Sequence, residues 1–259
     1  MLGEQRGRLV RVSGGPKARF TSDKRGAMLS RKSKAFFYSG AGPLMRLNGI
    51  LYRYFRAPRF GTLKVHLGPG QRNYLEGWVN VDANVFTGKC DVWADLRNPL
   101  PFHSSTVDAM YSHHVIEHLP DLGYHFKEVF RCLKPGGVYR VGGPNGDAAA
   151  AKLLEGDKEW FSDFPDKRSS IGGRFENFVF CRQEHLTVLT FSFLEEIAEK
   201  IGFRGIRRCK PVVETGSPGL FLDCMSKEYE SDLEVPHTLI AECTKADNGV
   251  LLERGHAAT

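Results

Sequence analysis

Between residues 62 and 145, short apolar runs alternate with segments of helical spacing. Five apolar runs predict strands, namely 63–68, 78–83, 90–96, 107–112 and 136–145. Residues 122–133 have helical spacing and are followed by Lys-Pro-Gly-Gly, which is a helix-ending signal. Strands and helices that alternate in one stretch predict an α/β fold, with a mostly parallel sheet and helices on both faces.

The pattern changes after residue 145. Residues 146–190 mix aromatic, charged and glycine positions. This segment is too long for an ordinary loop between a strand and a helix, so it predicts an inserted cap over a substrate site. A helix over 189–203 should end at Gly202. Two further strands, 206–213 and 237–245, bring the predicted sheet to seven strands. Residues 246–259 are expected to form a flexible C-terminus.

The N-terminal residues have a different pattern. Residues 1–42 are rich in Gly, Ser, Lys and Arg without periodicity, which predicts a flexible basic tail. In 43–60 the leucines recur at helical spacing, and this predicts an amphipathic helix that Pro43 begins and Pro58 ends. The helix either packs on the main domain, 61–245, or lies on a membrane surface.

Composition narrows these possibilities. The chain has 259 residues, 41% of them hydrophobic, which is enough for one substantial core. It has no secretory leader and no apolar run near the roughly 20 residues of a spanning helix, so a cytoplasmic protein is expected, with a peripheral membrane location as the alternative. The six cysteines are scattered, so neither a disulfide nor a metal site is expected.

Charge is distributed unevenly along the chain. The net charge is +6, but residues 1–60 contain 14 Lys and Arg against only two acidic residues. The remainder is therefore net acidic. This basic N-terminus is suited to an anionic partner, either a membrane surface or a nucleic acid.

Candidate binding residues lie at three successive strand ends. Gly68 and Gly70 follow the first strand, where glycine permits a tight turn and close approach of a ligand. Asp82 ends the second strand, where a carboxylate can bind the ribose hydroxyls of a nucleoside, and Asp95 ends the third. The third glycine of a dinucleotide fingerprint is absent, which argues against a nicotinamide enzyme.

The motifs HLGPGQRNYLEGWVNVD, ADLRNPLPF, VDAMYSHHVIEHL and FRCLKPGGVYRVGGPN occur in this order over about residues 63–145. This run resembles the class I, Rossmann-like methyltransferases of the type 11 kind, and within them a bacterial subgroup associated with glycan and polysaccharide pathways. The sequence departs from that family at Pro69, where Cys or a small residue is common, and at His66, where many members have an acid.

The resemblance implies S-adenosylmethionine as cofactor, S-adenosylhomocysteine as product and no metal. It implies that Gly68 and Gly70 flank the methionine moiety and that Asp82 binds the ribose. It further places the adenine at Asp95 and Leu96, and the inner side of the cofactor at Ser112, His113 and His114.

Methyl transfer needs alignment and, for a hydroxyl acceptor, a base. His114, His113 and His185 are the candidate bases, because a histidine titrates near neutral pH. Each could instead be structural, and Glu117 could orient one of them. Asn145, Trp160 and Phe161 are candidate acceptor-binding residues, with a turn and core packing as the alternatives.

Three functions therefore remain open. The favoured one is a methyltransferase acting on a small-molecule or glycan acceptor, at a hydroxyl oxygen. The others are an RNA or protein methyltransferase that docks through its basic N-terminus, and a non-catalytic scaffold with a methyltransferase-like fold. The oligomeric state cannot be read from the sequence.

Overall fold

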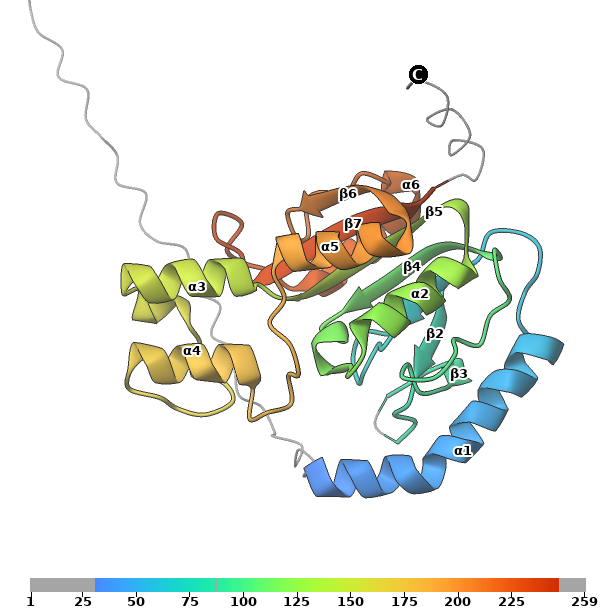
Figure 1. The fold of residues 1–259 in the computed structure, drawn as a ribbon, viewed down its shortest axis with the longest axis horizontal. Coiled ribbons are helices and arrows are strands. Elements are labelled where there is room, and N and C mark those ends of the chain that lie inside the picture. Colours follow the sequence, from blue (N-terminus) through green and yellow to red (C-terminus); the bar gives the residue numbers. More distant parts are fainter. Residues whose placement is uncertain (1–30, 87, 247–259) are drawn as a thin grey trace, which may run out of the picture.

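The computed structural model describes residues 31–86 and 88–246. The predicted basic tail therefore lies outside the described residues for positions 1–30, and so does the predicted C-terminal segment from residue 247 onward. The described chain forms one seven-stranded sheet with helices packed around it (Figure 1).

The sheet has the strand order β3-β2-β1-β4-β5-β7-β6. The strands are β1 (Lys64–Leu67), β2 (Val79–Asp82), β3 (Val92–Trp93), β4 (Val107–His113), β5 (Leu133–Pro144), β6 (Phe203–Cys209) and β7 (Thr238–Lys245). β1 to β5 pair in parallel, whereas β7 is antiparallel to both β5 and β6. The predicted mostly parallel, seven-stranded sheet is confirmed.

The carboxyl ends of β1, β2 and β4 meet at one edge of this sheet. β1 pairs in parallel with β2 and β4, and Leu67 of β1 lies beside Val81 of β2 and Ser112 of β4. Because strand order reverses between β1 and β4, the connections after these two strands diverge. Open α/β sheets bind ligands in the crevice at such a point.

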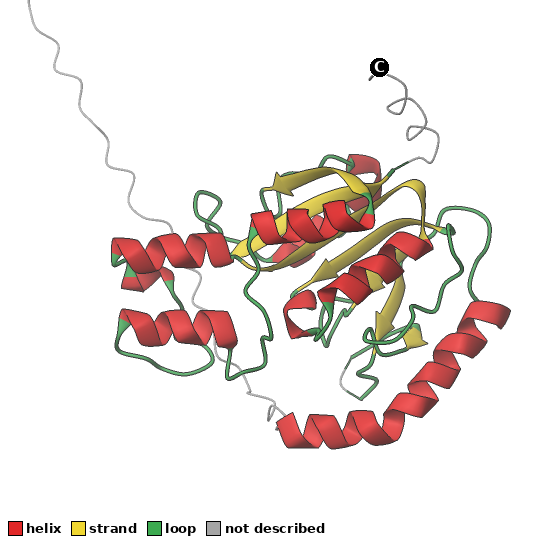
Figure 2. Cartoon of the chain, viewed as in Figure 1, coloured by secondary structure: helices red, strands yellow, loops and turns green. Residues whose placement is uncertain are grey.

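Two helices cover one face of the sheet, α2 (Leu122–Cys132) and α5 (Phe191–Ile201) (Figure 2). Both have apolar positions on one side, and the main core lies between them and the strands. Asp121 begins α2 by accepting a hydrogen bond from Tyr124 N at 2.8 Å. Gly202 ends α5 as predicted, with φ of +112°.

The opposite face is covered by shorter elements. α6 (Pro218–Phe221) and the 3₁₀ helix η3 (Met225–Glu228) pack there, where Trp78, Tyr111 and Phe221 share a second apolar cluster. The segment 214–236, which lies in the connection from β6 to β7, contains both of these short elements.

A buried ionic cluster attaches this second face to the sheet. Arg140 on β5 lies between Glu242 on β7, at 2.5 Å, and Glu228 on η3, at 2.7 Å. All three side chains are almost completely buried. Burial disfavours the charged form of Arg140, but the hydrogen bonds and charges of the two glutamates outweigh it and raise its pKa.

The N-terminal helix α1 (Arg31–Phe55) is longer than predicted. The prediction that Pro43 begins this helix was wrong, because Pro43 lies inside it, and residues 31–42 are helical rather than a flexible tail. Figure 1 shows that α1 bends near its middle, as expected where proline removes a backbone hydrogen bond and its ring clashes with the preceding turn.

α1 packs beside β3 at the edge of the sheet. Asn48 Nδ2 donates to Trp93 O at 2.8 Å, and the rings of Tyr52 and Phe102 meet edge to face. Among the described helices, none combines the length and the apolar composition needed to cross a bilayer.

The segment 146–190 contains α3 (Gly146–Glu155), the 3₁₀ helix η2 (Lys158–Trp160) and α4 (Ile171–Phe180). Figure 1 shows α3 and α4 as a lobe beside the sheet, next to the ends of β5 and β7. The lobe has its own apolar cluster, which includes Ala149, Trp160 and Phe161. We refer to 146–190 as the cap segment.

Candidate active site

The turn after β1 requires its two glycines. Gly68 and Gly70 have positive φ values of +72° and +59°, which favour glycine. A Cβ on Gly68 would lie 2.4 Å from Val115 Cγ2, so the segment after β4 runs directly against this turn. A Cβ on Gly70 would meet nothing within 4 Å, which leaves open space for a ligand.

Asp82 stands at the tip of β2 and holds the glycine turn in place. One carboxylate oxygen accepts a hydrogen bond from Gly70 N and the other from Asn84 N, both at 2.8 Å. Burial raises the pKa of Asp82, although these backbone hydrogen bonds act in the opposite direction. Each oxygen still has a lone pair to offer to a ribose hydroxyl.

Asp95 follows β3, the strand beside β2, and lies at the same edge of the sheet. The preceding residue, Ala94, is held next to Asp82 by a hydrogen bond from Ala94 N to Asp82 O at 3.1 Å. Its carboxylate is occupied by Arg97, whose guanidinium makes hydrogen bonds of 2.7–3.0 Å to both oxygens. An adenine amino group would have to share Asp95 with Arg97 or displace it. Leu96 belongs to the main core.

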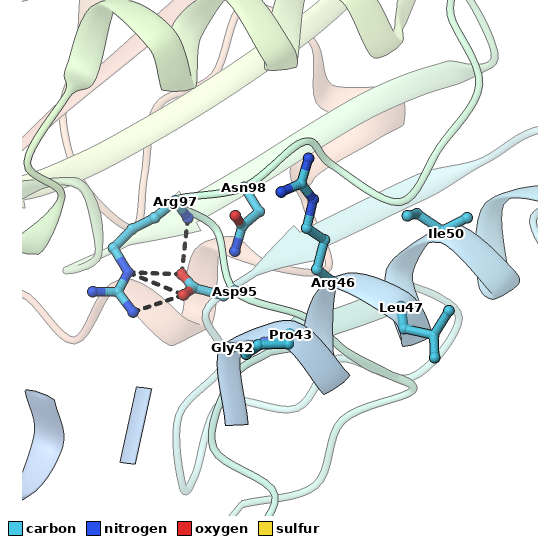
Figure 3. Close-up of a pocket in the computed structure, with 8 residues that line it drawn as sticks. All are labelled: Gly42, Pro43, Arg46, Leu47, Ile50, Asp95, Arg97 and Asn98. Atoms are coloured by element: carbon cyan, nitrogen blue, oxygen red, sulfur yellow. Dashed lines mark hydrogen bonds and ion pairs between the residues drawn. The ribbon is translucent and has the colours of Figure 1, made fainter. Parts of the chain in front are cut away.

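A cavity of about 620 Å³ opens between Asp95 and α1. Figure 3 shows Arg97 folded back onto Asp95 on one side of it, with α1 on the other. The lining residues are Gly42, Pro43, Arg46, Leu47, Ile50, Asp95, Arg97 and Asn98. The bent helix therefore forms a wall beside the predicted adenine site, which the sequence pattern alone did not indicate.

His114 follows β4 in a left-handed backbone conformation, with φ of +54°. Such strain in a residue other than glycine is common at functional sites. Its Nδ1 lies 3.2 Å from Glu117 Oε1, and the His114 side chain is 45% exposed. Because a carboxylate can only accept, His114 donates through Nδ1 and keeps a lone pair on Nε2.

Glu117 is buried beneath His114. Burial favours its neutral form, but the hydrogen bond from His114 and the charges of His114 and His118 outweigh burial, so the pKa of Glu117 lies below its ordinary value. An ionised carboxylate in this position orients the imidazole ring, as in catalytic histidine pairs.

The other candidate bases have different surroundings. His113 is buried, and burial, reinforced by the neighbouring His114, lowers its pKa well below the ordinary value. His185 is half-buried, with its pKa lowered mainly by burial, and its ring lies 5.0 Å from that of His118. Thus the neutral forms of His113 and His185 are favoured, and His114 is the most accessible of the three.

The remaining predicted residues have structural partners. Ser112 Oγ is buried and hydrogen-bonded to Tyr139 Oη at 2.7 Å. Asn145 caps α3 through Ala148 N and donates to Pro236 O. Trp160 and Phe161 pack in the cap segment, where Trp160 donates to Val235 O. Their roles toward cofactor and acceptor stay predictions.

Two further features of the site were missed from the sequence. The pairing of Arg97 with Asp95 could have been suspected from their spacing, because a side chain two residues away can fold back. The approach of His185 to Glu117 and His118 had no such signal, since nearly seventy positions separate them.

Residues 75–141 match a family model described as a methyltransferase domain, which is about a quarter of the chain. No curated protein matches. Among solved structures, a possible histamine N-methyltransferase from Thermotoga maritima has 15% identity and a TM-score of 0.47, covering 83% of this chain and 95% of its own. A methyltransferase from Archaeoglobus fulgidus has 15% identity and a TM-score of 0.45, with 82% and 99% covered.

Phosphoethanolamine N-methyltransferase 2 of Haemonchus contortus, in complex with S-adenosylmethionine, has 17% identity and a TM-score of 0.45, covering 76% of this chain and 51% of its own. Likenesses this distant do not indicate an acceptor. The methyltransferase match begins after the glycine turn and covers β2, with Asp82 at its end, as well as β3, β4 and most of β5. Residues 75–141 are thus similar to a methyltransferase domain, and they lie within a mostly parallel α/β sheet.

Proposed function

We propose that this chain is a class I methyltransferase that uses S-adenosylmethionine, and that it methylates a hydroxyl oxygen of a small-molecule or glycan acceptor. The observation that carries this proposal is the pair of His114 and Glu117, placed by Val115 directly beside the glycine turn. An oxygen nucleophile must lose a proton during methyl transfer, and an exposed imidazole oriented by a buried carboxylate can accept it.

The residues at the strand ends fit the cofactor. Gly70 leaves open space at the turn, and Asp82 retains acceptor capacity for the ribose hydroxyls. Gly68 would lie beside the methionine moiety, Asp95 and Leu96 near the adenine, and Ser112 and His113 on the inner side. When bound, S-adenosylmethionine supplies an activated methyl group, so the protein's task is alignment and proton removal.

In this arrangement His114 Nε2 takes the proton of the acceptor hydroxyl. Glu117 holds the other ring nitrogen and stabilises the imidazolium that forms. The cap segment would position the acceptor through Trp160 and Phe161, together with Asn145 directly before it. His113 and His185 are the other candidates for the base.

Replacing Asp82 by alanine is expected to weaken S-adenosylmethionine binding roughly 100-fold. Hydrogen bonds to a charged group contribute about 1.5–3 kcal/mol each, and the ribose and the turn both depend on this carboxylate. Isothermal titration calorimetry with S-adenosylmethionine and S-adenosylhomocysteine measures the effect. Glu76→Ala removes an exposed carboxylate in the same connection and serves as the matched control.

Absence of binding by the unmodified protein at millimolar ligand would contradict the enzyme assignment and favour a scaffold. Equal affinity of Asp82→Ala and Glu76→Ala would contradict the role of Asp82. The acceptor itself is sought by incubation with labelled cofactor and a panel of sugars, nucleotide sugars and small phenols. Labelling of RNA or protein instead would favour docking of a macromolecule through the basic N-terminus.

We also propose that α1 binds an anionic membrane surface. One side of the helix packs on the domain through Met45, Asn48 and Tyr52. Several large apolar residues of α1 are nevertheless exposed, and these are Leu44, Leu47, Ile50, Leu51, Tyr54 and Phe55. Of these, Leu47 and Ile50 also line the cavity beside Asp95. Arg46, Arg56 and Arg59 flank them, and apolar residues bordered by arginines suit an anionic bilayer interface.

The double variant Leu44→Glu with Phe55→Glu is expected to lose most binding to anionic vesicles. Both side chains are exposed, by 59% and 80%, so the fold should persist. Co-sedimentation with phosphatidylserine-containing and with neutral vesicles measures binding. Leu154→Glu, at an 88% exposed position of α3, is the control. Equal binding of both variants would rule out α1 as the membrane contact.

A further inference from the structure

Three side chains that can coordinate a metal meet where the segment after β4 touches the end of the cap segment. They are Glu117, His118 and His185, and their candidate ligand atoms all lie within 4.8 Å of one another. The backbone fixes this contact, because Leu186 N donates to Glu117 O at 2.7 Å. The cluster therefore joins two parts of the chain that are remote in sequence.

The hydrogen bonds of the two histidines prepare them for coordination. His118 Nδ1 lies 2.9 Å from Glu184 O, and His185 Nδ1 lies 3.0 Å from Val179 O. A carbonyl oxygen can only accept, so each Nδ1 carries the hydrogen and each Nε2 keeps its lone pair. Metal-bound histidines are typically held in this way, with the second nitrogen donating to a backbone carbonyl or a carboxylate.

Glu117 supplies the negative charge. Its side chain is 1% exposed, and Oε2 has no hydrogen-bond partner among the described residues. A buried carboxylate oxygen without a partner is costly, and a cation beside it would offset that cost. His118 is exposed, so an ion can reach the cluster from solvent.

We propose that Glu117, His118 and His185 bind one divalent transition-metal ion of the Zn²⁺ or Mn²⁺ class. Imidazole and carboxylate ligands suit such ions. With bonds of about 2.1 Å, ligands of a tetrahedral zinc ion lie about 3.4 Å apart. His118 Nε2 is 3.9 Å from Glu117 Oε1, so modest side-chain rotations would close the site.

The ion would have coordination positions left over, since the chain supplies three ligands. Glu117 Oε1 also contacts His114, so the ion and the proposed base share one carboxylate. A hydroxyl oxygen of the acceptor would complete the coordination and be held beside His114. This role of the metal rests on the proposed function, whereas metal binding itself does not.

The test uses the full-length protein, stripped of metal with a chelator and without cofactor or acceptor. Calorimetric titration with Zn²⁺, together with elemental analysis after dialysis, is expected to give about one ion per chain. His118→Gln and His185→Gln should each weaken binding roughly 100-fold or more, since even second-sphere changes cost 10- to 100-fold. His103→Gln, at a histidine outside the cluster, should bind as the unmodified protein does.

Less than stoichiometric Zn²⁺ in the unmodified protein would overturn the site, as would undiminished binding by a His118→Gln, His185→Gln double variant. Neither histidine is fully buried, and circular dichroism verifies that the variants fold. S-adenosylmethionine affinity, measured separately, tests the enzyme assignment. A protein that binds Zn²⁺ at this cluster but methylates no hydroxyl would retain the metal site and refute only its role in positioning the acceptor.

Discussion

His114→Asn is expected to lower kcat for methyl transfer to a hydroxyl acceptor by roughly 100- to 10,000-fold, the contribution typical of a general base. Asparagine suits this position because it tolerates the left-handed backbone that His114 adopts. It also lacks the ring nitrogen that would receive the proton. The backbone beside the glycine turn is therefore retained while the base is removed.

The dissociation constant for S-adenosylmethionine should change much less than kcat in this variant, since His114 is expected beside the inner side of the cofactor but not at the ribose or the adenine. Initial rates with labelled cofactor and the acceptor found in the screen measure kcat, and calorimetry measures binding. His103→Gln is the control for loss of a histidine elsewhere. An unchanged kcat in His114→Asn would contradict the role of His114 as the base.

Arg140→Met is expected to destabilise the fold by about 3–5 kcal/mol, because it leaves two buried carboxylates without their common cation. The two glutamates also accept hydrogen bonds from Val212 N, Thr215 Oγ1 and Gly216 N. Loss of the arginine should therefore loosen the whole 210–228 segment that covers the second face of the sheet.

Equilibrium unfolding in urea measures this loss. The matched control is Arg207→Met on β6, where the ion pair with Glu214 is exposed to solvent and should contribute little to stability. If both variants lost the same small amount, the buried cluster would not be what attaches this segment. A change in the m-value, the dependence of the free energy of unfolding on urea concentration, would instead indicate a change in the denatured state.

Much of the main domain could be predicted from the sequence, because the signals there are local. Each strand is a short apolar run, and Gly68, Gly70 and Asp82 follow strands directly. Parallel strands then bring such residues to one edge, so the contact of Gly70 with Asp82 follows from topology.

The N-terminal helix was harder to predict, because its local sequence does not favour one continuous helix and contacts with the domain stabilise it. Glycine and serine positions in 31–42 weaken helix propensity, and proline normally begins a helix. Contacts such as those of Asn48 and Tyr52 with the domain stabilise α1 despite Pro43, and these contacts have no sequence signature. The same reason explains why the approach of His185 to Glu117 could not be foreseen.

The position of α1 also bears on how the sheet avoids pairing with other chains. β3 is an edge strand, and an unpaired strand edge invites edge-to-edge aggregation. Asn48 of α1 donates a hydrogen bond to the backbone carbonyl of Trp93, which belongs to that edge. At the opposite edge, β6 carries Arg204, Arg207 and Arg208 and an irregularity in its register, which are the usual protections of an exposed edge. A chain that lacks residues 1–60 would thus keep the charged edge at β6 but lose α1, the helix that shields the edge at β3.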